Sequence, residues 1–356
     1  MIFLKDKDSH FFLFDDICVL NQNLLIIFMK IFMETLLVTG GAGFIGSNLA
    51  DALLAQGYKV LAVDNLDDFY DPEIKRKNIA AAMLHPNYTF IYSDICNIDF
   101  VEKQIPADIS AIIHLAAKAG VRNSILIPDS YECYNTDSLT SSLELAVRLN
   151  IKKIIFTSSS SVYGNSVQVP FRESQLDLNP LSPYAISKLK SEQIGNNFAE
   201  KYDISFISLR LFSVYGPRLR PDLMLYKIAQ CLYNGSPLKI FGNGMIKRDF
   251  TYVDDVVNGI ICSMDYPAGN FEIFNIGYGC PVSIIELIAL FEKNAGKKIR
   301  TEFGNAISGE SDITWADNSK AKKLMDFQPK ISLNEGIGCF LKWFDEYVNK
   351  NSLCAE

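Results

Sequence analysis

The sequence predicts an α/β fold, a doubly wound parallel sheet followed by a smaller, irregular C-terminal lobe. From residue 35 onward, short β-branched and apolar runs alternate with longer amphipathic stretches, and the short runs are continuously apolar. Strands of this kind are buried on both faces, which requires helices on both sides of a parallel sheet. After residue 210 the pattern becomes less regular, because Gly, Pro and Asn are frequent as far as Gly244.

The expected elements of the first part follow one another in alternating order. Each strand is a short run rich in Val, Ile, Leu or Phe, and each helix has apolar residues at helical spacing. The last helix begins after Ser182 and Pro183, and proline favours the first turn of a helix. Strands are expected at 36–39, 60–63, 90–92, 111–115, 153–158 and 204–209, and helices at 44–56, 131–149 and 184–201.

The composition suits a protein with a substantial core. The chain has 356 residues, of which 49% are hydrophobic and 21% charged, and its formal net charge is −7. These values exclude intrinsic disorder, and the lack of a Lys/Arg block argues against nucleic acid or a membrane as a partner. Eight scattered cysteines without a C-x-x-C pair indicate reduced thiols, a cytoplasmic location and no metal site.

Residues 1–32 do not match the rest of the chain. They contain an apolar run at 24–29 that is too short to cross a bilayer, and their acidic residues do not fit a signal peptide. A membrane-surface anchor is one interpretation. A disordered or mis-assigned extension, with the natural start at Met29 or Met33, is favoured because a strand begins directly afterwards. Removal of residues 1–32 is expected to leave folding and activity intact.

A glycine-rich turn joins the first strand to the first helix. Gly40, Gly43 and Gly46 let the backbone turn tightly and approach a pyrophosphate, which the helix N-terminus attracts. Asp64 ends the second strand, where a carboxylate accepts hydrogen bonds from both ribose hydroxyls. Residues 65–68 include no Arg for a 2′-phosphate, so NAD is favoured over NADP. Taken alone, the glycines also fit a purely structural turn.

A second polar cluster combines a serine run with a helix. Tyr184 and Lys188 are four residues apart, so both side chains project from one helix face. A phenol is a poor base at neutral pH, but a nearby ammonium and bound NAD⁺ lower its pKa by favouring the phenolate. Tyr-x-x-x-Lys alone is common in amphipathic helices. The serines at 158–161 and the dinucleotide turn make a reaction centre the better interpretation.

The G-x-x-G-x-x-G spacing and these two motifs together resemble the extended short-chain dehydrogenase/reductase family, which includes nucleotide-sugar epimerases and dehydratases. The resemblance runs from about residue 35 to 345. It implies NAD as cofactor and a catalytic set of Tyr184, Lys188 and Ser159, the serine lying 184 − 159 = 25 residues before the tyrosine. The cofactor-binding residues it implies are Gly40, Gly43, Phe44, Ile45, Gly46, Asp64, Asn65, Asp94, Ile95, Leu115, Ala116, Ala117, Lys118, Tyr184 and Lys188.

The family's reaction types differ at two positions after Ser159. Its 4,6-dehydratases carry Asp and Glu where Ser160 and Ser161 stand, and its decarboxylases place a Glu at Ser161. Two serines cannot supply the acid and base that loss of water requires. Both reactions are therefore disfavoured, which leaves epimerisation at one carbon or a one-way reduction of a keto sugar.

The substrate region most closely resembles that of the uronate 4-epimerases. Hexose epimerases usually carry Asn at Ser213, and here Arg220 follows in the same loop. A guanidinium binds a planar carboxylate in a bidentate manner, although a surface or phosphate-binding arginine is the alternative. The resemblance also places Phe241 near uracil and Arg248 at the diphosphate. The implied substrate-binding residues are Ser159, Ser160, Ser161, Tyr184, Ser213, Arg220, Phe241 and Arg248.

The remaining implications concern support and assembly. Asn135, Asp249 and Asp255 are expected to be structural, the last two at an interlobe turn and a helix start, and Arg122 fits either the nicotinamide side or solvent. Thr314 leaves room for an N-acetylated sugar. The helices around 131–149 and 184–201 resemble a pair that builds a dimer interface in relatives, so a homodimer is expected.

The sequence therefore divides into the extension 1–32, a Rossmann-type NAD-binding domain at 33–210, and a substrate lobe mainly at 211–350, part of which returns to the first domain. The expected function is NAD-dependent C4 epimerisation of a UDP-sugar through a 4-keto intermediate, with UDP-glucuronate to UDP-galacturonate favoured. Alternatives are a UDP-glucose or UDP-N-acetylglucosamine 4-epimerase and a keto-sugar nucleotide reductase. A non-catalytic NAD-sensing protein is disfavoured because Tyr184 and Lys188 are both present.

Overall fold

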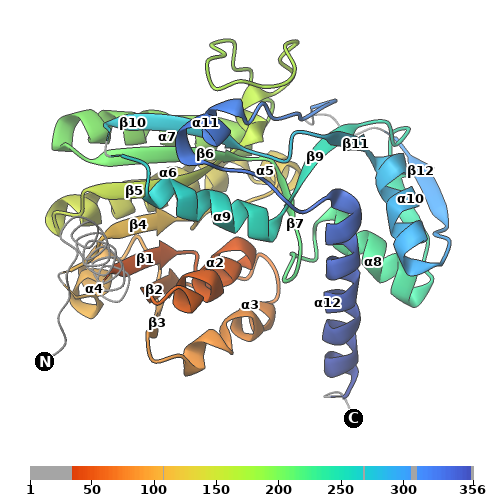
Figure 1. Cartoon of the computed structure of the whole chain (residues 1–356), viewed down its shortest axis with the longest axis horizontal. Coiled ribbons are helices and arrows are strands. Elements are labelled where there is room, and N and C mark those ends of the chain that lie inside the picture. Colours follow the sequence, from red (N-terminus) through yellow and green to blue (C-terminus); the bar gives the residue numbers. More distant parts are fainter. Residues whose placement is uncertain (1–33, 107, 268, 306–310, 354–356) are drawn as a thin grey trace, which may run out of the picture.

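A seven-stranded parallel sheet forms the centre of the molecule. The computed structural model describes residues 34–353 except 107, 268 and 306–310, so the N-terminal extension at 1–32 lies outside it (Figure 1). The strands lie in the order β10-β6-β5-β4-β1-β2-β3, and every neighbouring pair is parallel. This is the doubly wound order with one further strand beyond β6, which confirms the expected fold class. The strands are β1 (Thr35–Thr39), β2 (Lys59–Asp64), β3 (Tyr88–Tyr92), β4 (Ala111–His114), β5 (Lys153–Ser159), β6 (Ser205–Leu211) and β10 (Phe271–Ile276).

Helices cover both faces of this sheet because its strands are apolar on both sides. In β1, Leu36 and Val38 pack with α2 and α9, whereas Leu37 between them packs with α6. Figure 1 shows α2 and α9 side by side on one face. The helices of this part are α2 (Phe44–Ala55), α3 (Pro72–Ile79), η1 (Ala82–Leu84), α4 (Ile98–Gln104), α5 (Val121–Leu126), α6 (Pro128–Arg148), η2 (Ser160–Tyr163), α7 (Pro183–Tyr202), α9 (Val253–Met264) and α11 (Ser319–Met325).

Each strand and helix expected from the sequence has a counterpart in this part, and the differences lie at the ends. The helix expected at 131–149 begins earlier, at Pro128, because proline favours the first helical turn. The strand expected at 204–209 continues to Leu211, and that expected at 90–92 begins at Tyr88.

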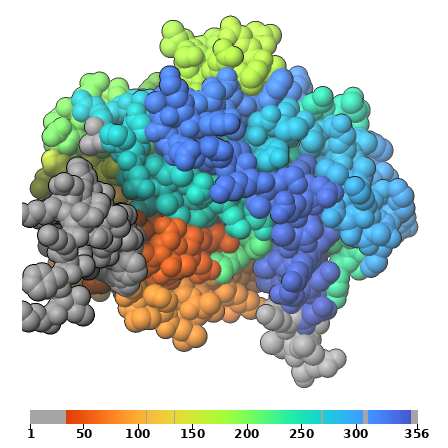
Figure 2. Space-filling view, viewed as in Figure 1, coloured from red at the N-terminus to blue at the C-terminus, as the bar shows by residue number. Residues whose placement is uncertain are grey.

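The chain after β6 builds a second lobe and also returns to the main sheet. Two small sheets, β11-β9-β7 and β12-β8, form the lobe together with α8, α10 and α12. In contrast, α9 packs on α2, and β10 pairs with β6 at the edge of the main sheet. Figure 2 shows the C-terminal part in blue beside the first elements in red and orange. The lobe consists of β7 (Ser213–Tyr215), α8 (Met224–Asn234), β8 (Leu238–Phe241), β9 (Lys247–Tyr252), β11 (Pro281–Ser283), α10 (Ile284–Ala295), β12 (Thr301–Gly304) and α12 (Leu333–Leu353).

No helix within the described ranges is both long and apolar enough to cross a membrane.

A buried histidine joins three elements next to the strand ends. His114 closes β4, and its Nδ1 lies 2.9 Å from both Thr39 Oγ1 in β1 and Ser142 Oγ in α6. The Thr39 hydroxyl also accepts a hydrogen bond from the Ala116 amide at 3.2 Å. Burial lowers the pKa of His114 to about 3, so the ring is neutral at physiological pH.

This arrangement predicts an acid-sensitive contribution to stability. The unfolded chain protonates His114 below its ordinary pKa of 6.5, whereas the folded chain does so only near pH 3. The stability that the neutral His114 ring contributes is therefore fully present above pH 6.5 and is lost as the pH falls toward 3. Between about pH 7 and about pH 5, the free energy of unfolding should fall by about 2 kcal/mol more in the native protein than in His114→Gln. Urea unfolding at both pH values measures this, and an equal pH dependence contradicts a neutral buried ring.

Candidate active site

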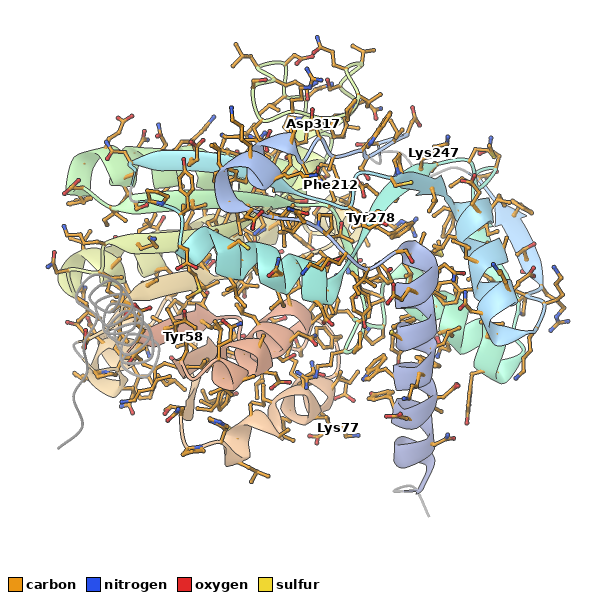
Figure 3. All side chains as sticks on the ribbon, in the orientation of Figure 1. Tyr58, Lys77, Phe212, Lys247, Tyr278 and Asp317 are labelled. Atoms are coloured by element: carbon orange, nitrogen blue, oxygen red, sulfur yellow. The ribbon has the colours of Figure 1, made fainter. Side chains whose placement is uncertain are left out.

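A cavity of about 1000 Å³ opens where the carboxyl ends of the main-sheet strands face the second lobe. Ligands of doubly wound sheets bind at this edge, because the polar residues that follow the strands gather there. Phe212, between β6 and β7, lines the cavity at the junction of the two lobes (Figure 3). Every residue that the sequence assigned to catalysis, cofactor or substrate lines this same cavity.

The glycine turn forms one wall. Gly40 has a φ of +68°, and a Cβ on it would lie 2.8 Å from the Ala116 nitrogen. A Cβ on Gly46 would lie 2.3 Å from the Gly40 oxygen. Only glycine therefore allows this close approach. Helix α2 begins directly after Gly43, which has no side chain to cap it, so its first N–H groups suit the phosphates of a dinucleotide.

Asp64 is held at the end of β2. Its carboxylate accepts hydrogen bonds from the amides of Ala42 (3.0 Å) and Leu66 (2.8 Å). Close by, Asn65 donates to Asp94 at 2.9 Å. These contacts fix acceptor oxygens where the two ribose hydroxyls of NAD would lie, so the residues present fit this cofactor.

Lys75 in α3 is a cavity residue that sequence reasoning missed. Its side chain is buried and its Nζ lies 3.9 Å from Asp64 Oδ1. In the sequence it stands in the charged stretch Lys75-Arg76-Lys77, and nothing in that pattern distinguishes it from a solvent-exposed lysine.

Asn135 in α6 connects the loop after β4 with the catalytic helix. Its side-chain oxygen accepts a hydrogen bond from the Lys118 amide at 2.8 Å. Its side-chain nitrogen donates hydrogen bonds to the Lys118 carbonyl at 3.1 Å and to the Ser187 hydroxyl at 2.9 Å. The Lys118 ammonium itself lies 3.9 Å from the ring centroid of Tyr134. Asn135 therefore has the supporting position that the sequence suggested.

The three catalytic candidates converge from β5 and α7. The Ser182 hydroxyl caps α7 by accepting from the Ala185 amide at 3.2 Å, which sets the helix start just before Tyr184. Lys188 lies one turn further and donates from Nζ to the Thr157 carbonyl at 2.8 Å. At the end of β5, the Ser159 hydroxyl accepts hydrogen bonds from the amide and the hydroxyl of Ser161 at 3.2 and 2.9 Å.

The charges of this cluster differ from the sequence expectation. Burial raises the pKa of the Tyr184 phenol, and the opposing contributions come from the Ser159 hydrogen bond and the Arg220 guanidinium. Burial also lowers the pKa of Lys188 to about 7, although the Glu192 carboxylate opposes it. In the protein alone, burial therefore dominates the pKa of Tyr184, and the groups that lower it are Ser159 and Arg220, whereas the sequence prediction relied on Lys188 together with bound NAD⁺.

The part of the cavity next to β7 contains Ser213 and a fixed arginine. Arg220 donates from Nε and Nη2 to the two Asp222 oxygens at 3.0 and 2.8 Å. The Phe69 ring lies 5.4 Å from the guanidinium carbon. Asp222 occupies one edge of the planar guanidinium, so the edge formed by Nη1 and Nη2 is the one on which a ligand carboxylate would bind. Sequence reasoning gave no role to Phe69 or Asp222.

Two cations that line the cavity lie over one aromatic ring of the second lobe. Arg122 from α5 and Lys239 from β8 lie 4.9 and 5.6 Å from the ring of Phe241. Arg248 in β9 also lines the cavity. Local positive charge of this kind suits a diphosphate in a protein whose net charge is −7.

Two acids that do not line the cavity, Asp249 and Asp255, hold backbone segments of the second lobe. Asp249 is fully buried and accepts hydrogen bonds from the amides of Gly279 and Ala316, both at 2.9 Å. Asp255 accepts from the amides of Lys330 and Ile331 at 2.8 and 3.0 Å. Asp255 lies in the first turn of α9, so it stands at a helix start as expected, and its carboxylate also holds the segment before α12.

The fold and this cavity define a short-chain dehydrogenase/reductase of the extended type. A family model described as "NAD dependent epimerase/dehydratase family" matches residues 36–277, and the chain belongs to this family.

Three relatives extend the comparison. UDP-glucuronate 4-epimerase of Thermodesulfobacterium geofontis is 40% identical over 314 residues, covering 88% of this chain and 96% of that protein. The crystal structure of UDP-glucuronic acid 4-epimerase from Bacillus cereus in complex with UDP-glucuronic acid and NAD has a TM-score of 0.81 and 34% identity, with 88% and 99% coverage. The structure of UDP-glucose 4-epimerase from Thermotoga maritima with UDP-glucose has a TM-score of 0.81 and 32% identity, with the same coverage.

Proposed function

We propose that this protein is an NAD-dependent C4 epimerase that converts UDP-glucuronate to UDP-galacturonate. The observation that carries the proposal is the guanidinium of Arg220, which Asp222 holds in plane at the sugar end of the cavity. The name of the 40% identical relative supports the same substrate. On this proposal residues 33–210 are mainly the cofactor domain, and 211–350 are mainly the substrate lobe.

Proton transfer at the sugar C4 falls to Tyr184. Its phenolate accepts the proton of the 4-hydroxyl, and the Ser159 hydroxyl bridges the two oxygens. The glycine turn and Asp64 would hold NAD⁺, which would supply the hydride acceptor for C4 and a positive ring that favours the phenolate. Lys188 holds a positive charge beside the reacting groups. Tyr184 then returns its proton to the C4 oxygen once the 4-keto sugar has turned over in the pocket, so that the returning hydride meets the other face of C4.

The sugar substituent at C5 distinguishes this substrate from a neutral hexose. A carboxylate there meets Ser213, Ser160 and Ser161 as neutral hydroxyls and Arg220 as a cation. Bidentate, charge-assisted hydrogen bonds to a guanidinium are strong and directional. An acidic pair at 160 and 161 would repel this carboxylate, so the two serines suit a uronate as well as arguing against dehydration.

The alternatives differ in substrate and in the fate of the hydride. Thr314 lines the cavity and its hydroxyl accepts a hydrogen bond from the Asp249 amide at 3.2 Å, so this position is small and fixed. That favours a UDP-N-acetylglucosamine 4-epimerase as the second candidate, with UDP-glucose as a third substrate. A keto-sugar reductase would consume NADH, and an NAD-sensing protein would turn over no sugar.

One experiment separates these candidates. Purified protein is incubated with UDP-glucuronate, UDP-glucose and UDP-N-acetylglucosamine without added reductant, and the C4 epimers are resolved by chromatography. We expect UDP-galacturonate to form with the highest kcat/KM of the three. Preferential turnover of a neutral sugar would reject the uronate, and conversion only with added NADH would indicate a reductase.

We also propose that the protein is a cytoplasmic homodimer. Helices α6 and α7 pack together and carry large exposed side chains, among them Tyr134 and Ile186, with Leu126 and Ile127 just before α6. Exposed apolar residues on neighbouring helices are typical of a subunit interface. The cysteines Cys96, Cys231, Cys262, Cys280 and Cys339 are free thiols, as expected of a reducing compartment.

A further inference from the structure

A buried ion pair lies directly behind the catalytic cluster. Arg210 in β6 donates from Nε and Nη2 to the two oxygens of Glu192 in α7 at 2.9 and 2.7 Å. Both side chains are almost fully buried, with exposed fractions of 2% and 3%. The Ser208 hydroxyl donates a further hydrogen bond to Glu192 at 3.1 Å. Neither charged residue lines the cavity, so the reaction does not use them directly.

This pair touches both segments that carry catalytic groups. Glu192 stands two helical turns after Tyr184 and one after Lys188, on the same face of α7. Arg210 lies opposite Ser158 in the register of β5, and its guanidinium carbon is 4.8 Å from the ring centroid of Tyr163. Tyr163 ends η2, the turn that begins immediately after Ser159, and its hydroxyl donates to Asn275 in β10 at 2.7 Å. The pair therefore connects the helix of the base to the turn that follows the catalytic serine.

The neighbouring charges make Glu192 the anion that acts on Lys188. From α7 itself, the Glu192 carboxylate favours the charged ammonium. From β4, His114 is neutral at physiological pH, and from α6 Tyr131 faces Tyr184 edge-on with ring centroids 6.3 Å apart. From the substrate loop, Arg220 is already paired with Asp222. Charges interact strongly at this depth because water does not screen them.

We propose that the Glu192–Arg210 pair positions α7 and sets the proton affinity of the Tyr184/Lys188 couple. Glu192 stands one helical turn from Lys188 in α7 and Arg210 lies across the pair in β6, so the two charges act on the couple with opposite sign. A variant that lacks one of the two charges leaves the other charge without its partner in the protein interior. This inference rests on the proposed function, in which Tyr184 is the base.

Two single variants test whether the two charges shift the apparent pKa of the Tyr184/Lys188 couple in opposite directions. In Glu192→Gln the remaining cation favours loss of a proton, so the apparent pKa on the acid side of the kcat profile should fall by at least about half a unit. In Arg210→Met the uncompensated carboxylate should raise that pKa by a similar amount. A role that is only structural lowers kcat or stability in both variants without opposite shifts. Shifts of equal sign, or none, overturn the proposal.

A second readout does not depend on turnover. The tyrosinate absorbance of each protein is titrated and compared with the same protein carrying Tyr184→Phe, so that the difference reports Tyr184 alone. The shifts should match those of the kcat profile in sign. If the native protein titrates normally but turns over no UDP-sugar, the proposed function fails while this inference is still tested.

Two further variants complete the design. Glu102→Gln removes an equal charge from an exposed pair with Arg148, and we expect no shift because solvent screens it. Removing one partner of a buried pair is strongly destabilising and can prevent folding. Ser208→Ala deletes only the hydroxyl that donates a hydrogen bond to Glu192. It should raise the apparent pKa on the acid side of the kcat profile by a few tenths of a unit. If the single-charge variants do not fold, an unchanged pKa in Ser208→Ala rejects the proposal.

Discussion

Replacing Tyr184 by phenylalanine should lower kcat by about 10²–10⁴-fold, the range of general acid–base catalysis, while the protein keeps its NAD. The change removes only the phenolic oxygen of a residue that lines the cavity and whose pKa is influenced by Ser159. Lys188 and the glycine turn are unaffected, so the cofactor contacts remain. Turnover of UDP-glucuronate and the NAD released on denaturation measure the two outcomes.

The matched control is Tyr202→Phe at the end of the same helix. Tyr202 packs on Phe198 with ring centroids 5.3 Å apart and does not line the cavity. We expect this variant to retain native kcat. Substantial activity in Tyr184→Phe would reject Tyr184 as the base, and loss of NAD from it would show a cofactor-binding role instead.

Replacing Arg220 by alanine should reduce kcat/KM for UDP-glucuronate by at least about 10²-fold, because truncating one partner of a buried charge pair costs about 2–5 kcal/mol. The loss for UDP-glucose should be below about tenfold, since a neutral hydroxymethyl group makes no ion pair. Some loss for both sugars is expected, because the Arg220 guanidinium also favours the phenolate of Tyr184. Initial rates with both sugars, measured above the acid limb of the pH profile, separate the two effects.

Arg218 offers the control in the same loop. It forms an ion pair with Asp51 in α2 at 2.6 Å and does not line the cavity. Arg218→Ala removes the same charge from the same segment, so any loss should be equal for the two sugars. Equal losses in Arg220→Ala would show that Arg220 supports the loop or the nucleotide instead of the carboxylate.

The sequence by itself determined the fold class and many of the residues that line the cavity. Helical spacing places Tyr184 and Lys188 on one face, and the glycine turn can form only between a strand and a helix that pack closely. Parallel strands end at one edge, so Asp64, Leu115 and Ser159 come together without further information. These features follow from the local geometry of helices and strands, which is why they can be read from residue order.

Only the tertiary structure determined which side chains pair and how their pKa values shift. Lys75 beside Asp64, Asp222 on Arg220 and Arg210 on Glu192 are contacts set by packing. The pKa of Tyr184 depends on how completely the phenol is removed from water. Burial and pairing arise where helices, strands and loops pack against one another in the folded chain, and the spacing of residues along the chain does not record them.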